Sequence, residues 1–193
     1  HFYTHSGIDY LGRVRAVLGN LKKIGTGRRP AGASTITQQV AKNFLLSSEL
    51  SYTRKIKEAI LARRIDKAFS KEHILELYLN EIYLGNRAYG VAAAALNYFG
   101  KSLDDLSLDE IAYLAALPKG PNNYNPKTRY DAAVARRNWV ISRMVEDGYA
   151  DAKEAEVAKK RPLKVVERKS GFLKDTEYYS EEVRRTISRN YGD

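Results

Sequence analysis

A succession of helix start and stop signals runs through the first 160 residues and leaves little room for strands. Ser70 precedes a segment of helical periodicity, Gly85 follows it, and Ser107 stands three residues before Glu110 in the pattern of a capping box. The expected helices cover residues 9–22, part of 32–46, 54–69, 71–84, 88–100, 108–117, 130–148 and 150–160. The body of the chain is therefore expected to be mostly α.

Size and composition fit one globular domain followed by a connector. The sequence has 193 residues, of which 44% are hydrophobic and 29% charged, as in packed domains rather than disordered chains. Beyond Pro162 the residue pattern changes: residues 163–175 have strand character, and residues 178–192 are expected to form a polar helix. No stretch reaches the roughly 18 apolar residues that a membrane span needs. Because the sequence begins at His1 without a methionine, we expect a piece of a longer chain, and a membrane anchor outside it stays open.

The charge balance favours an anionic partner. Lysine and arginine number 33 against 23 acidic residues, a formal charge of +10. Such a surplus suits nucleic acid, anionic lipid or a phosphorylated substrate, and does not choose among them. The absence of cysteine removes thiolate zinc sites and cysteine nucleophiles.

The helix expected within 32–46 carries an unusual polar face. Ser34, Thr35, Gln38, Gln39 and Lys42 supply hydroxyls, amides and one ammonium near its start, where free N–H groups and the helix dipole add positive character. This set suits an oxygen-rich anion such as a phosphate or sugar phosphate. The alternative is a capped helix whose polar face is exposed to solvent and binds no ligand.

The next helix offers a compact charge cluster. Arg54, Lys55 and Glu58 fall on one face of its first turns, where the carboxylate would stay ionised and orient both cations. A departing phosphate needs such a set of cations. The alternative is an ordinary exposed Arg–Glu pair four residues apart.

The remaining helices are interpreted mainly as scaffold. Asn80 is a candidate for hydrogen bonding to sugar or backbone, and Trp139 is expected to pack beside solvated arginines that include Arg137. The core stripe expected for the helix over 71–84 consists of Leu75, Tyr78, Leu79 and Ile82.

Five motifs together resemble those of a known family. In chain order they are Phe2-x-x-His5-x-Gly7, GASTITQQVAKN (32–43), RKIKE (54–58), ILELYLNEIYLG (74–85) and ARRNWVISRM (135–144). They are similar to the motifs of peptidoglycan glycosyltransferases, the glycosyltransferase family 51 domains of class A penicillin-binding proteins and of monofunctional transglycosylases. The resemblance implies a glycosyltransferase domain over 1–162. It also implies that 163–193 is a linker toward a transpeptidase domain that the sequence does not contain.

The resemblance implies a fold and a reaction. The family fold is mostly α and two-lobed, with a large lobe resembling lysozyme and a smaller lobe that faces the membrane. The family polymerises lipid II into glycan strands with inversion and releases undecaprenyl pyrophosphate, on the outer side of the bacterial plasma membrane. The implied partners are lipid II, the growing glycan, the membrane surface and a covalently linked transpeptidase domain, without nucleic acid.

The resemblance also assigns roles to residues. Those expected to bind the substrate or its pyrophosphate are Ser34, Thr35, Gln38, Gln39, Lys42, Arg54, Lys55 and Asn80. Glu58 is expected as a second carboxylate, which positions the cations or an assisting divalent cation, Mg or Mn. No cofactor is otherwise implied.

Two departures from the family pattern stand out. The family's general base is a glutamate four residues before the phenylalanine matching Phe2, so it falls ahead of His1 and no residue here is assigned that role. Leu50 stands where many members have a pyrophosphate-binding arginine, and Arg28 or Arg29 is a candidate substitute.

Two alternative functions are open at this stage. A lysozyme-like lytic transglycosylase would cleave glycan and needs no pyrophosphate site. A basic helical nucleic-acid-binding module fits the charge, although the cations are spread over many helices and no motif of that kind is present.

Overall fold

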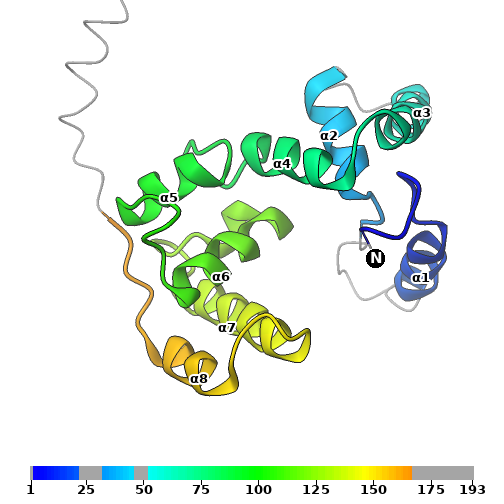
Figure 1. Ribbon diagram of the computed structural model, residues 1–193. Coiled ribbons are helices and arrows are strands. Elements are labelled where there is room, and N and C mark those ends of the chain that lie inside the picture. Colours follow the sequence, from blue (N-terminus) through cyan, green and yellow to red (C-terminus); the bar gives the residue numbers. More distant parts are fainter. Residues whose placement is uncertain (1, 22–31, 46–51, 167–193) are drawn as a thin grey trace, which may run out of the picture.

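The computed structural model describes residues 2–21, 32–45 and 52–166, and within these ranges the chain is built from helices (Figure 1). The α-helices are α1 (Tyr10–Leu21), α2 (Ile36–Leu45), α3 (Tyr52–Ala68), α4 (Lys71–Glu81), α5 (Val91–Phe99), α6 (Leu108–Ala116), α7 (Tyr130–Glu146) and α8 (Ala152–Lys160). Two short 3-10 helices, η1 (Leu117–Lys119) and η2 (Pro121–Tyr124), join α6 to α7. The expectation of a mostly α fold is confirmed. Leu163–Val166 do not form the expected strand, and the rest of the tail lies outside the described residues.

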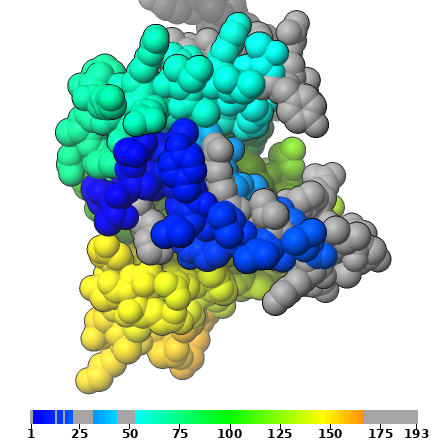
Figure 2. All heavy atoms as spheres, turned by 90° about the vertical axis from the view of Figure 1, so that its right-hand side faces the viewer, coloured from blue at the N-terminus to red at the C-terminus, as the bar shows by residue number. Residues whose placement is uncertain are grey.

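Helix α4 runs between two groups of helices (Figure 1). On one side α2 packs against both α3 and α4, and on the other α6 packs against α7 and α8. Helix α1 lies on the outside of the molecule, on the face shown in Figure 2. One core cluster extends from α2 to the segment after α8, and its buried members include Val40, Ile74, Tyr78, Ile82, Leu84, Tyr98, Phe99, Tyr113, Leu114, Leu117 and Leu163. The two-lobed division stays a prediction.

The connection between α4 and α5 differs from the expected boundaries. Helix α4 ends at Glu81 rather than at Gly85, because Ile82 already has extended backbone angles. Asn86 and Arg87 both have positive φ, and the Ala88 N–H donates to the Gly85 carbonyl over 2.8 Å, as in a type I′ turn. The chain therefore doubles back before α5 begins.

The α4 stripe is also corrected: Ile74 and Tyr78 are buried, whereas Leu79, expected in the core, is exposed.

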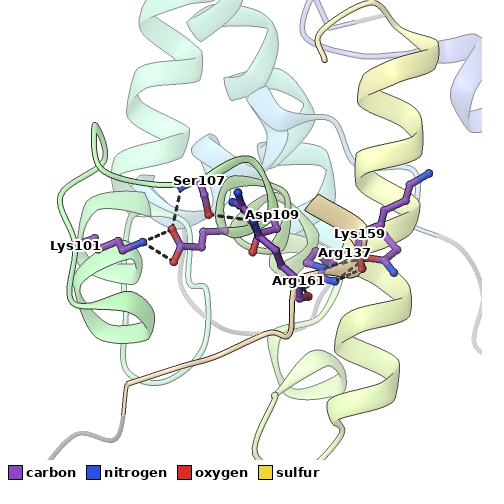
Figure 3. A network of polar contacts seen from close by, with 8 residues as sticks. Lys101, Ser107, Asp109, Arg137, Lys159 and Arg161 are labelled. Carbon is purple, nitrogen blue, oxygen red and sulfur yellow. Dashed lines mark hydrogen bonds and ion pairs between the residues drawn. The ribbon is translucent and has the colours of Figure 1, made fainter. Parts of the chain in front are cut away.

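Arg137 locks the end of α8 to α7 (Figure 3). Its side chain is fully buried and donates to the carbonyls of Arg161 (2.8 Å) and Lys159 (3.0 Å), while Asn138 accepts two further bonds. Trp139 is half exposed. Trp139 is thus not packed in the core as expected, although Arg136 lies 4.0 Å from the centre of its ring. The expectation of a solvated side chain was wrong for Arg137, because the carbonyls at the end of α8 provide a buried site for its guanidinium.

The packed chain continues past residue 162. Leu163 is buried in the core cluster, and its N–H donates to the Tyr130 hydroxyl over 3.1 Å. The Val166 N–H donates to the Tyr98 carbonyl over 2.8 Å. The domain boundary at residue 162 stays a prediction, and beyond it Leu163 and Val165 still pack against the core cluster.

Candidate active site

The start of α2 is closed by a capping box. The Gln38 N–H donates to Thr35 Oγ1 over 3.2 Å, and the Thr35 N–H donates to Gln38 Oε1 over 3.1 Å. Both residues are buried. Two of the residues expected to bind substrate are thus engaged in satisfying the helix start, in the reciprocal pattern that stabilises N-termini. The wet polar face considered from the sequence is not what the structure shows at these two positions.

Thr35 also ties α2 to the beginning of the chain. Its hydroxyl donates to the Gly7 carbonyl over 2.7 Å. Gly7 has φ +78°, and a Cβ there would lie 2.6 Å from the Ala62 carbonyl oxygen of α3. Only glycine allows this conformation and this close approach without strain. The segment around Gly7 is therefore held between α2 and α3.

A cluster of two cations and one carboxylate lies on the first turns of α3. Glu58 is 1% exposed, and its two oxygens lie 2.8 and 2.9 Å from Lys55 Nζ. Arg54, also buried, lies 3.6 Å from the same carboxylate. Ser34, the residue just before the α2 cap, accepts a hydrogen bond from Lys55 Nζ over 3.4 Å. The alternative of an exposed surface pair is wrong for Arg54 and Glu58, because both are buried.

This arrangement leaves one positive charge in excess of the carboxylate. The side chain of Lys55 is 51% exposed, whereas that of Glu58 is buried. The buried carboxylate therefore holds the ammonium in place while the ammonium still faces solvent. The neighbouring N-terminus of α2 adds a partial positive charge. The cluster can therefore receive an anionic group at a defined position, where a fixed charge stabilises negative charge that develops during a reaction.

The other expected site residues lie outside this cluster. Gln39 is half-buried and Lys42 is exposed, both on α2, and Asn80 is exposed at the end of α4. Leu50, Arg28 and Arg29 lie outside the described residues. Of the candidates, Ser34, Arg54, Lys55 and Glu58 lie together, and the ligand roles of all the candidates stay predictions.

Glu58 does not fit the role of a metal ligand in this structure. Both of its oxygens are within hydrogen-bond distance of Lys55 Nζ, and an ammonium in that position competes with a cation. Within the described ranges no group of three or more His, Cys, Asp or Glu side chains could hold a metal ion.

Comparison with known proteins decides the family. Residues 1–145 match the family model described as Transglycosylase. The chain belongs to the transglycosylase family. The α3 cluster and the α2 cap both fall inside the matched range.

The relatives of this transglycosylase domain are penicillin-binding proteins. Penicillin-binding protein 1A of Rickettsia bellii is 48% identical over 192 residues, covering 100% of this chain and 24% of the relative. The protein of the same name from Escherichia coli K12 is 46% identical over 192 residues, covering 100% and 22%. A crystal structure of penicillin-binding protein 1A from Haemophilus influenzae superposes with a TM-score of 0.50 at 35% identity, over 82% of this chain and 20% of that one. The chain therefore spans about a quarter of the length of the curated relatives it matches.

Proposed function

We propose that this chain is the peptidoglycan glycosyltransferase part of a longer penicillin-binding protein and polymerises lipid II into glycan strands. The observation that carries the proposal is the half-exposed Lys55 ammonium held by the buried Glu58, within a chain that belongs to the transglycosylase family. The reaction joins the 4-hydroxyl of an acceptor sugar to the anomeric carbon of the growing chain, with inversion, as undecaprenyl pyrophosphate leaves. Matches to penicillin-binding proteins do not favour the lytic or nucleic-acid-binding alternatives.

The described residues serve the leaving group in this mechanism. Lys55 meets the pyrophosphate as its negative charge grows, and Glu58 fixes the direction of the ammonium in advance, so little reorganisation is needed in the transition state. Arg54 contributes to the same positive field from beneath. Lys42, exposed on α2, is the second cation proposed to contact the pyrophosphate. The general base is proposed to lie upstream of His1.

Helix α1 supports a membrane surface as a partner. Leu11, Val14, Leu18 and Leu21 recur at spacings of three and four, and each is more than half exposed. An exposed apolar stripe on one helix suits the boundary between lipid headgroups and acyl chains. No helix within the described residues is long and apolar enough to cross a bilayer. We therefore propose that α1 lies on the membrane surface, and that the linked transpeptidase domain and the plasma-membrane location belong to the longer protein.

Polymerisation of lipid II by the full-length protein tests the proposal. Lys55→Ala removes a charge that acts on the leaving group, so kcat should fall about 100-fold to 1000-fold, the range for loss of one preorganised stabilising group. Glycan length and rate are followed by gel electrophoresis of labelled lipid II products. The full-length protein is used because it includes the residues upstream of His1.

The matched control is Lys57→Ala, which removes an exposed lysine from the same helix. Its kcat should stay within about twofold of wild type, because a solvent-exposed charge outside the site contributes little. Equal rates for the wild type and the Lys55 variant would refute the proposed site. Release of anhydro-muropeptides from preformed glycan by the wild type would instead establish the lytic alternative.

A further inference from the structure

Lys71 has a charge of the wrong sign for its place in the fold. It is the first residue of α4, where the helix dipole disfavours a cation. Its side chain is only 18% exposed, so its ammonium has also lost most of its water. A lysine in such a place needs specific partners, because an unpaired buried charge is strongly unfavourable.

The partners of Lys71 join three segments of the chain. Its Nζ donates to Asp66 Oδ1 at the end of α3 and to the His5 carbonyl, both over 2.5 Å. The same ammonium lies 5.0 Å from the centre of the Phe2 ring, within cation–π range. Two of the three partners thus belong to residues 2–8, which we term the N-terminal turn. Lys71 fixes this turn to the junction of α3 and α4.

The N-terminal turn has a second anchor near the candidate active site. Thr35 donates to the Gly7 carbonyl from the α2 cap, and Ser34, its neighbour, is bonded to Lys55. One end of the turn is therefore held by Lys71 and the other by the helix start that borders the cation cluster.

Helix α1 follows directly from this turn. Asp9 caps it, accepting from the Gly12 N–H over 2.7 Å. Residues of the N-terminal turn and of the first turns of α1 together line a hollow of about 310 Å³, among them His5, Ser6 and Arg15. Helix α1 forms the outer layer of the face in Figure 2. The turn thus fixes where α1 begins, and how firmly the turn is held bears on the orientation of the helix.

We propose that Lys71 is a positioning residue for the glycosyltransferase reaction: by fixing the N-terminal turn, it sets the orientation of the lipid-facing helix α1 relative to the Ser34–Lys55–Glu58 cluster. This inference rests on the proposed function. The substrate is part lipid and part sugar pyrophosphate, so it must reach the cluster from the membrane. The distance and angle between α1 and the cluster therefore decide how often the pyrophosphate is placed against the Lys55 ammonium. Lys71 itself does not contact substrate.

The structural half of the test measures the position of α1 directly. Spin labels are attached to cysteines introduced at Gly19 of α1, where a side chain would meet open space, and at the exposed Lys57 of α3. Pulsed electron–electron double resonance on the full-length protein should give a narrow distribution of distances between the two labels when Lys71 is present. Lys71→Met should broaden or shift it, whereas Lys71→Arg, which keeps the charge, should preserve it.

The functional half uses lipid II in bilayer vesicles. Lys71→Met should lower kcat at least tenfold with KM and vesicle binding within twofold of wild type, and Lys71→Arg should recover most of the rate. The matched control, Lys67→Met, removes an exposed lysine at the end of α3 and should change neither readout. Circular dichroism establishes that each variant is folded. Asp66→Asn removes the negative charge that pairs with Lys71 but keeps a hydrogen-bond acceptor, so its distance distribution and its kcat should lie between those of the wild type and of Lys71→Met.

The imidazole of His5 supplies an independent signal. Burial, followed by the charge of Lys71, lowers the pKa of His5, so Lys71→Met should raise that pKa in an NMR titration. An unchanged distance distribution or an unchanged kcat in the methionine variant overturns the inference. If the wild type does not polymerise lipid II, the proposed function fails, and the distance measurement alone still confirms or refutes the hold of Lys71 on α1.

Discussion

Two threonines at the start of α2, the cap Thr35 and Thr37 in the first turn, have opposite environments. Thr35 donates to the Gly7 carbonyl and accepts from the Gln38 N–H. Thr37 is fully buried, and its hydroxyl has no hydrogen-bond partner in the part of the chain that the structure describes. Burying a hydroxyl without a partner is unfavourable, whereas burying a bonded one is close to neutral.

Valine at each position should therefore shift stability in opposite directions. Thr37→Val removes an unpaired hydroxyl at constant shape and should raise the free energy of unfolding by about 1 kcal/mol. Thr35→Val removes the cap and the bond to Gly7 and should lower it by about 2 kcal/mol. Urea unfolding followed by circular dichroism measures both. The same sign for the two variants would contradict the assigned environments.

Gln38 shows what sequence could and could not reveal at the residue scale. The spacing from Thr35 to Gln38 is a legible capping-box pattern, yet an amide beside other polar residues equally suggested a ligand-binding face. The α3 cluster was predictable because its members lie within one helical turn of each other. The contacts of Lys71 were not, because His5 lies 66 residues away in the sequence and local patterns do not report such pairings.

Helix α6 begins with a capping box that also carries an ion pair (Figure 3). Glu110 accepts from the Ser107 N–H over 2.9 Å and from Lys101 Nζ over 2.8 Å. Burial acts to raise the pKa of Glu110, but the hydrogen bonds from Lys101 and Ser107 outweigh it and hold that pKa below its ordinary value. The folded state therefore binds the ionised carboxylate more strongly than the unfolded state does.

This linkage predicts a pH-dependent effect of Glu110→Gln. Because the folded pKa is depressed, the stabilisation is present above the unfolded value of about 4.3 and is lost as pH falls through the lower folded value. The variant should lose about 1 kcal/mol of unfolding free energy at pH 7, and the difference should fade below about pH 4. Unfolding curves between pH 3 and 7 measure it.

The control for this prediction is Glu156→Gln on α8, whose exposed pair with Lys159 should contribute little at any pH. An effect at Glu110 that is independent of pH would show that charge is not involved.

Element boundaries were predicted best where a side-chain cap marks them. Helices α4 and α6 begin directly after Ser70 and Ser107, as expected. The end of α4 and the start of α5 were misplaced because Asn86 and Arg87 both adopt positive φ. Arginine rarely does so, and its identity gave no warning that the chain would turn there.

At the scale of the whole molecule, the exposed stripe of α1 makes vesicle binding a direct test. The double variant Leu11→Gln and Leu18→Gln, which adds no charge that anionic lipid would attract, should weaken binding to anionic vesicles at least tenfold. Each leucine contributes of order 1 kcal/mol when it inserts, and a tenfold change corresponds to about 1.4 kcal/mol. Sedimentation with vesicles measures the affinity of the full-length protein.

Tyr149→Gln is the matched control, since Tyr149 is a similarly exposed side chain in the segment that joins α7 to α8. It should leave vesicle binding unchanged. If the α1 double variant and the Tyr149 control lost the same amount of vesicle affinity, membrane contact would not be specific to α1.

The grip of Arg137 on the carbonyls of Lys159 and Arg161 has a mechanical consequence. Arg161 is itself held by Asp109, so the backbone leaving α8 is fastened to both α6 and α7. Tension along the polypeptide after Val166 would have to break the hydrogen bonds of Arg137 and the ion pair of Arg161 before α8 could separate from α6 and α7. The helices that carry the cation cluster are thereby shielded from pulling forces that arrive through the following chain.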